Sequence, residues 1–167
     1  MSIRSILQLG DPALYESSAE VRREDLEGLD EVVRDLADTM ADFRARYGAG
    51  RAIAAPQIAV PLRLVYLDIG EPVVLINPVI LERGDETIEV WDDCMSFPDL
   101  LVKVRRHRAI TVRYRDRGWK ERSIEAVDDL SELLQHEIDH LDGVLATMRA
   151  IDGRSFAWRS ERGRVKG

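Results

Sequence analysis

The sequence predicts an α+β domain, and three observations lead to this class. A long segment has the apolar spacing of a helix, six short runs rich in β-branched and aromatic residues follow it, and a second helical segment comes later. Strands grouped in this way favour antiparallel sheets packed around a central helix rather than alternating βα units. The 167 residues are typical of one domain, so we expect residues 1–167 to form a single unit.

The first helical segment is predicted over residues 25–47. Its apolar residues recur at steps of three and four with charged residues between them: Leu26, Leu29, Val32, Val33, Leu36, Met40, Phe43 and Tyr47. This spacing is typical of a long N-terminal amphipathic helix that covers a sheet. Residues 48–57 are small and turn-rich, so their backbone can approach another group closely.

Six strands are then predicted, over residues 62–69, 73–80, 86–91, 100–104, 109–115 and 119–126. The turn residues at 116–118 favour a hairpin between the last two strands. A second helix is expected to begin near Asp128 or Asp129, whose side chains can cap it, and to end at Gly143. Residues 159–167 are basic and polar, and we expect them to be a disordered tail.

Composition narrows the class of partners. The formal net charge of −7 disfavours nucleic-acid binding, which needs a concentrated positive field. The single cysteine, Cys94, cannot form an internal disulfide, which fits a cytoplasmic protein. The first twelve residues contain no secretory signal, and no later run approaches the ~18 apolar residues of a membrane span. We therefore expect neither export nor a membrane partner.

The second helix carries the pattern His-Glu-x-x-His, at His136, Glu137 and His140. The two histidines are one helical turn apart, so both imidazoles can bind one metal ion. Glu137 falls among the apolar positions of this helix, and a bound metal would compensate the burial of a carboxylate beside two imidazoles. Alternatively, the pattern is a chance match whose histidines are satisfied by neighbouring carbonyl groups.

A catalytic metal site usually has three protein ligands and one open position, so the third ligand decides between these readings. An extended metzincin motif would need a histidine where the chain has Ala146. His107 lies in a cationic stretch and is interpreted as a surface residue, and Glu161 lies in the polar tail. Cys94, which ends a predicted strand just before Pro98, remains. Its alternative role is that of a small buried hydrophobic residue.

Three segments carry a resemblance to the peptide deformylase family. Residues 50–57 resemble its G-x-G-L-A-A-x-Q loop, residues 92–96 its E-G-C-L-S strand end, and residues 135–140 its Q-H-E-x-D-H helix. The opening at residues 10–14 is also similar, so the resemblance covers nearly the whole chain. It implies a metal-dependent hydrolase that removes the formyl group from N-formyl-methionine of nascent polypeptides near the ribosome.

The resemblance also implies roles for individual residues. The metal ligands fall on Cys94, His136 and His140. Glu137 becomes the general acid and base, which takes a proton from the attacking water and passes it to the leaving amine. The Gln57 side chain and the Met95 backbone amide would polarise the formyl oxygen. Substrate contacts fall on Gly50, Ala52 and Ile53.

Some residues depart from the family's motifs. Ala52 stands where the family's loop has its second glycine and Asp93 where a glycine precedes the cysteine, while Asp92 and Met95 are milder replacements. These changes motivate the alternative of a deformylase-like protein with lost or altered activity, acting on other N-acyl groups or binding N-terminal peptides. An endoproteolytic zincin is disfavoured by its missing ligand.

The resemblance further implies an arginine, Arg106, that pairs with Asp92 and Asp139. One histidine is expected to have its distal nitrogen held by Asp139 or a backbone carbonyl group. One divalent metal is implied, with Fe²⁺ expected in the cell and Zn²⁺, Ni²⁺ or Co²⁺ in preparations, because a thiolate with two imidazoles suits each of them.

Overall fold

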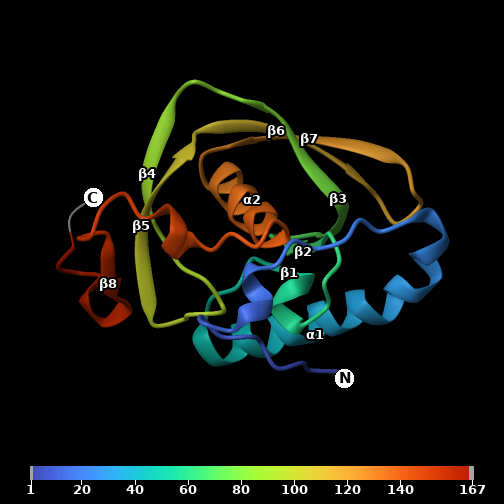
Figure 1. The fold of residues 1–167 in the computed structure, drawn as a ribbon, viewed down its shortest axis with the longest axis horizontal. Helices are drawn as coiled ribbons and strands as arrows, with labels where there is room; N and C mark the ends of the chain where they lie inside the picture. Colours follow the sequence, from blue (N-terminus) through green and yellow to red (C-terminus); the bar gives the residue numbers. More distant parts are fainter. Residues whose placement is uncertain (1, 166–167) are drawn as a thin grey trace.

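Antiparallel strands form two sheets in the computed structural model, which describes residues 2–165 (Figure 1). One sheet has five strands in the order β1-β2-β3-β6-β7, and the other has three in the order β4-β5-β8. The strands are β1 (Ala52–Ala54), β2 (Leu64–Asp68), β3 (Pro72–Arg83), β4 (Thr87–Asp92), β5 (Leu100–His107), β6 (Ala109–Arg115), β7 (Glu121–Val127) and β8 (Phe156–Trp158). Antiparallel sheets combined with a long helix agree with the expected α+β class.

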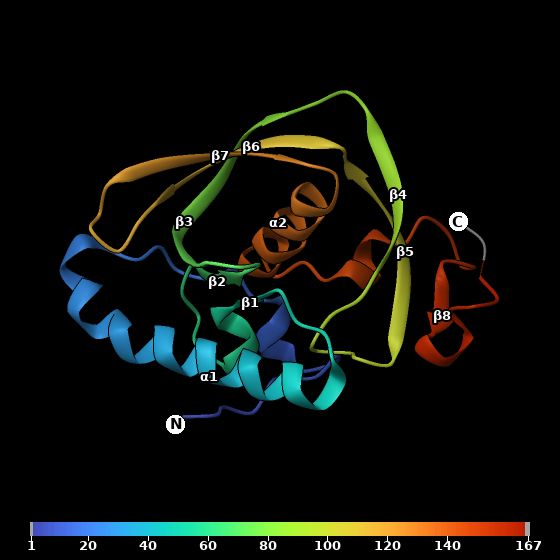
Figure 2. The same cartoon turned by 180° about the vertical axis from the view of Figure 1, so that it is seen from behind.

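Two α-helices occupy different positions relative to these sheets. Helix α2 (Asp128–Leu141) lies in the middle, enclosed by strands of both sheets, and α1 (Leu29–Tyr47) runs along the outside near β1 and β2 (Figures 1 and 2). Ten of the 14 residues of α2 are buried. A helix surrounded in this way can hold polar side chains away from water.

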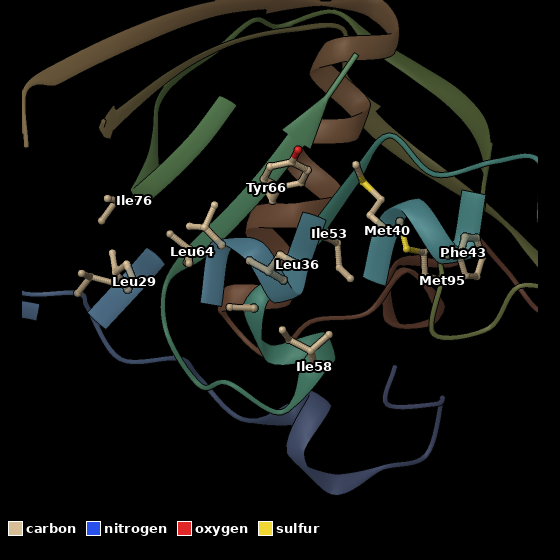
Figure 3. Close-up of a cluster of buried hydrophobic side chains, with 13 residues drawn as sticks. Leu29, Leu36, Met40, Phe43, Ile53, Ile58, Leu64, Tyr66, Ile76 and Met95 are labelled. Atoms are coloured by element: carbon tan, nitrogen blue, oxygen red, sulfur yellow. The ribbon is translucent and has the colours of Figure 1, made fainter. Parts of the chain in front are cut away.

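Alternation along the strands divides the core. In β2, Leu64 and Tyr66 belong to the cluster that packs on α1, while Val65 and Leu67 belong to the cluster that packs on α2. Successive strand side chains point to opposite faces, so the five-stranded sheet is covered by α1 on one face and α2 on the other. Figure 3 shows the α1 cluster, in which Met95 lies near Met40 and Phe43.

The helix boundaries differ slightly from expectation. The first helix begins at Leu29, because residues Arg23–Gly28 form a 3₁₀ turn in which Asp25 accepts a hydrogen bond from the Arg22 N–H. Gly28, a poor helix former, is the last residue of this turn. Helix α2 begins at Asp128 without a side-chain cap, so the capping role expected for Asp128 or Asp129 was wrong.

The C-terminal end of α2 meets the N-terminal part of the chain. Gly143 has φ +70°, the left-handed conformation expected after the helix. A Cβ atom on Gly143 would lie 2.4 Å from the Tyr15 carbonyl oxygen, so only glycine fits here. The Ser18 N–H donates to the Leu141 carbonyl group at 2.9 Å, which anchors this crossing.

The strand predictions located six of the eight strands and left out two short ones. Strand β6 has the predicted bounds, and β6 and β7 form the expected hairpin. Strands β1 and β8, each three residues long, were not predicted. Strand β3 continues past the predicted end at residue 80 to Arg83, because it keeps pairing with β6 through two register shifts.

The tail also differs from expectation over the described residues. Arg159–Glu161 form a 3₁₀ turn after β8, so disorder is not what the structure has here, while residues 166–167 lie outside the described part of the chain. Among residues 2–165, no helix is both long and apolar enough to cross a membrane.

Candidate metal centre

Three potential metal ligands converge at the inner face of α2. His136 and His140 come from successive turns of this helix, and Cys94 comes from the loop after β4. The Cys94 sulfur lies 3.4 Å from His140 Nε2, which lies 3.2 Å from His136 Nε2. The three ligand atoms lie within 4.8 Å of one another, and all three residues are buried. These are the residues that the sequence singled out as ligands.

The donor set fits a divalent metal ion. A sulfur and two imidazole nitrogens around one point are the ligands that zinc, iron and cobalt accept in proteins. Burial, reinforced by the charge of His136, holds the pKa of His140 well below its ordinary value, so its imidazole is neutral and carries a free lone pair. Burial acts to lower the pKa of His136, but its interactions with the Asp92 carboxylate first and with Cys94 second outweigh it and raise the pKa.

A buried ionic network orients His136. Its Nδ1 lies 2.9 Å from Asp92 Oδ1, so Nδ1–H donates to the carboxylate and Nε2 faces the other ligands. Arg106 donates to Asp92 at 3.0 Å and to Asp139 at 2.6 Å, as the resemblance implied. Burial alone would raise the pKa of Asp92, but the charges of His136 and Arg106 hold it below its ordinary value.

The histidine nitrogen expected to be held by Asp139 or a backbone carbonyl group is held by Asp92 instead. Asp139 has other partners. Its carboxylate accepts from Arg106 and, in a two-point contact at 2.6 and 2.8 Å, from Arg149. These two guanidinium groups draw the side chain away from the imidazoles. His140 Nδ1 has no hydrogen-bond partner among the described residues.

Glu137 lies beside the ligands with one oxygen free. The residue is 4% exposed, its Oε2 is buried without a hydrogen-bond partner among the described residues, and it lines a cavity. Burial raises the pKa of Glu137 to about 7, opposed by the charge of His136 and reinforced by that of Asp92. A carboxyl group of this pKa can both accept and donate a proton near neutral pH.

Gln57 and Met95 flank the same point. The Ala54 N–H donates to Gln57 Oε1 at 2.9 Å, which leaves Gln57 Nε2 pointing to the Cys94 sulfur at 3.5 Å and to Ser96 Oγ at 3.2 Å. The Met95 N–H has no hydrogen-bond partner within residues 2–165. Both groups can donate to an oxygen atom that enters the site.

A cavity of about 320 Å³ opens onto this cluster. Apolar residues of its lining include Phe43, Tyr47, Met95, Pro98 and Leu133. Beside Cys94, His136 and Glu137, the lining also includes charged residues: Arg51, Asp92, Asp93, Glu132 and Arg159. A cavity of this volume that combines apolar side chains with converging polar groups is typical of a small-ligand site.

The three residues expected to contact substrate are placed differently. Gly50 and Ala52 line the cavity. Gly50 has φ +137°, a backbone conformation that favours glycine, and a Cβ atom added to it would lie 3.3 Å from the Met95 side chain. Ala52 sits in β1, an extended conformation that needs no glycine. The side chain of Ile53 does not line the cavity, because strand alternation turns it into the α1 cluster. Ile53 is not among the residues that line the cavity, and its contact with substrate stays a prediction.

Two ion pairs at the cavity were missed from the sequence. Arg51 pairs with Glu132 at 2.7 Å, and Arg159 pairs with Asp93 at 2.7 Å. The Asp93 carboxylate therefore points to Arg159, neither at the metal ligands nor free in solvent. The signal that was available is Asp93 itself, since a carboxylate next to a metal ligand needs a cationic partner.

The other metal-ligand candidates lie elsewhere. His107 is half-buried rather than on the surface, with its Nδ1 2.9 Å from the Gly84 carbonyl oxygen. Its backbone exchanges hydrogen bonds with Gln135 of α2, at 3.0 and 2.8 Å, which fastens the helix to β5. Neither His107 nor Glu161 joins the ligand cluster found among the described residues.

Comparison with known proteins identifies the family and the fold. The family described as polypeptide deformylase matches residues 3–155. The chain is similar to a peptide deformylase of Rhizobium meliloti, with 43% identity over 152 residues that cover 87% of this chain and 83% of that protein. A relative from Bartonella tribocorum is 40% identical over 153 residues with the same coverage.

A solved structure gives the same result. The crystal structure of peptide deformylase from Thermotoga maritima superposes with a TM-score of 0.83 and 32% identity, covering 91% of this chain and 100% of that one. The match extends from the N-terminal segment through the loop of Cys94 to α2. This chain belongs to the peptide deformylase family.

Proposed function

We propose that the chain carries out the reaction of its family through the cluster described above. The enzyme hydrolyses the formyl amide of N-formyl-methionyl peptides and releases formate. The observation that carries the assignment of residues is the meeting of Cys94, His136 and His140 with an unpartnered Glu137 at one cavity. A histidine pair, a thiol and a free carboxyl group together supply what metal-assisted amide hydrolysis requires.

Cys94, His136 and His140 would hold one divalent metal, which makes α2 a metal-binding helix. When bound, the ion lowers the pKa of a water molecule and polarises the formyl carbonyl group. The donor set accepts several metals, and we expect Fe²⁺ in the cell and Zn²⁺, Ni²⁺ or Co²⁺ in some preparations. Metal analysis of protein purified with and without oxygen tests this expectation.

Glu137 moves the proton in this mechanism. Its free Oε2 accepts a proton from the attacking water, and the water oxygen adds to the formyl carbon. The same carboxyl group then donates the proton to the leaving amine as the carbon–nitrogen bond breaks. Burial of Glu137 excludes bulk water, which would otherwise compete for the proton.

Gln57 and Met95 stabilise the developing oxyanion. The Gln57 side-chain amide is held by its bond from the Ala54 N–H, and the Met95 N–H is free to donate. Donors fixed before the reaction cost little reorganisation, and removing one typically lowers kcat by about 10²–10³.

The apolar residues that line the cavity suit a methionine side chain. A relative from Acinetobacter baumannii, with a TM-score of 0.81 and 26% identity, was solved with Met-Ala-Ser bound. We propose that the substrates here are likewise methionyl peptides, which the enzyme would bind in the cytoplasm as nascent chains emerge from the ribosome. Gly50 and Ala52, which line the cavity, would contact the bound residue.

The two larger departures from the family's motifs, Ala52 and Asp93, leave the ligand cluster intact. Ala52 occupies an ordinary strand position, and Asp93 is turned toward Arg159. With the residues of the reaction present and the family established, the alternative of a protein with lost or altered activity is not favoured.

Formate release from a formyl-methionyl peptide tests the proposal. Protein prepared without oxygen and loaded with iron should release formate, and an acetyl-methionyl peptide should release no acetate. Glu137→Ala should lower kcat by about 10²–10⁴ while retaining one metal per chain. Full activity in Glu137→Ala would contradict the mechanism, and a metal-loaded wild type without formate release would contradict the function.

A further inference from the structure

The C-terminal part of the described chain reaches the loop that carries Cys94. The family match ends at residue 155, and β8 (Phe156–Trp158) with the turn Arg159–Glu161 follows. Strand β8 pairs with the beginning of β5, from Leu100 to Val102, and lies beside it in both views (Figures 1 and 2). This pairing brings Arg159 to the loop between β4 and β5, residues 93–99.

Arg159 contacts both ends of that loop. Its backbone N–H donates to the Asp99 carbonyl group, its Nε donates to the Pro98 carbonyl group, and its Nη2 donates to the Asp93 carboxylate. Each of these distances is 2.7 Å. One residue therefore joins the position before Cys94 to the positions where the loop returns to the sheet.

The loop held in this way carries the reacting groups. It contains Cys94 and Met95, and none of its residues pairs in either sheet. Its own bonds form a turn, with the Phe97 N–H donating to the Cys94 carbonyl group at 3.0 Å and the Ser96 N–H to the Cys94 sulfur at 3.4 Å. A loop outside the sheet depends on such contacts for its rigidity.

We propose that Arg159 is a positioning residue, which fixes the loop so that the Cys94 sulfur and the Met95 N–H keep their places beside α2. The proposal rests on the proposed deformylase function. It also assigns a role to Asp93, which supplies the carboxylate that the guanidinium needs at the near end of the loop. The planar fork of arginine holds Nε–H and Nη2–H in fixed directions toward the Pro98 carbonyl group and the Asp93 carboxylate, a geometry that the single ammonium nitrogen of lysine does not reproduce.

A different role for Arg159 is direct contact with the peptide. The residue lines the cavity, its side chain is 39% exposed, and its Nη1 has no hydrogen bond within the described residues. A substrate contact would change KM, whereas a positioning role changes kcat and the metal site. The experiment therefore separates the two roles.

The test compares full-length Arg159→Gln, Arg159→Lys, Asp93→Asn and the double variant Asp93→Asn/Arg159→Gln with the wild type. Arg164→Gln is the matched control, because Arg164 lies in the same segment, pairs with Glu161 and contacts neither loop nor cavity. Metal release to a chelator, the thiolate-to-cobalt absorption band of Co²⁺-loaded protein, kcat, KM and Tm are measured for each.

For Arg159→Gln we expect about fivefold faster metal release, an altered cobalt band and about fivefold lower kcat with KM unchanged. A factor of about five corresponds to the upper end of what a partly exposed ion pair contributes. Arg159→Lys should recover part of each effect. The double variant should resemble Arg159→Gln rather than the product of the two single effects, because the residues share one interaction.

The proposal is overturned if only KM rises, if Arg159→Gln behaves like Arg164→Gln, or if Tm falls while release, spectrum and kcat stay unchanged. Failure of the proposed function has a separate sign, the absence of formate release from the metal-loaded wild type. Metal release and the cobalt band still test the role of Arg159 in that event.

Discussion

Arg105 and Arg106 are neighbours in β5, yet they face opposite surroundings. Arg105 points outward, is 56% exposed in its side chain and pairs with Glu89. Arg106 points inward, is 3% exposed and joins Asp92 to Asp139 beneath the metal ligands. The difference teaches that two arginines one position apart can contribute very differently to stability, little on the surface and much in the buried network beside the metal ligands. Desolvation decides which, since a buried charge cannot turn to water when its partner is removed.

The largest effect is expected on removing the inner arginine. Arg106→Ala leaves Asp92 and Asp139 buried with less compensation, so the free energy of unfolding should fall by about 3–5 kcal/mol. Arg105→Ala on the outer face should cost under about 1 kcal/mol. Urea denaturation of both variants checks the contrast, and equal losses would show that burial does not separate the two arginines.

A smaller effect is expected at Asp92, where the inner network of Arg106, Asp92 and Asp139 contacts a metal ligand. Asp92→Asn keeps the shape of the side chain but removes the charge that holds His136 Nδ1–H. Metal affinity should fall by about 10–100-fold, as for other residues that orient a ligand. Competition with a chromophoric chelator measures the metal affinity. An unchanged affinity would mean that the helix alone fixes the orientation of the His136 imidazole.

The smallest effect is expected at the ion pair of Arg51 and Glu132, which lines the cavity. Arg51→Gln breaks the pair with Glu132, whose members are 45% and 13% exposed in their side chains. Partial exposure limits the loss in stability to about 1 kcal/mol or less. A thermal or urea scan in low and high salt should show that the difference from wild type shrinks as salt rises. A loss as large as that of Arg106→Ala would place this pair with the inner network.

The sequence anticipated what local periodicity and motif spacing control. Helical spacing located α1 and α2, alternation located β6, and the one-turn separation of His136 and His140 placed both in the cluster. Elimination then left Cys94, although it is 46 positions from His140. These signals are carried by neighbouring residues or by residue types that are rare in the chain.

Long-range contacts were beyond its reach. Asp139 or a backbone carbonyl group was expected to hold a histidine, but Asp92 holds His136, while Arg106 and Arg149 bind Asp139 from other segments. Ile53 was expected at the substrate because it lies in the loop motif, but β1 pairs with β2 and turns that side chain to α1. Arg159 gave no local pattern, since its partners are 61 and 66 positions away.

The N-terminal segment gives the site an order of assembly. The Leu7 N–H donates to the Gln57 carbonyl group at 2.8 Å, and the Leu9 N–H donates to the Ser96 carbonyl group at 2.9 Å. One short stretch thus joins the loop that carries Gln57 to the loop that carries Cys94. During synthesis these first residues leave the ribosome long before Ser96 exists, so they cannot reach their final partners until more than half of the chain has been made. The enzyme must therefore remain incomplete through much of its own translation.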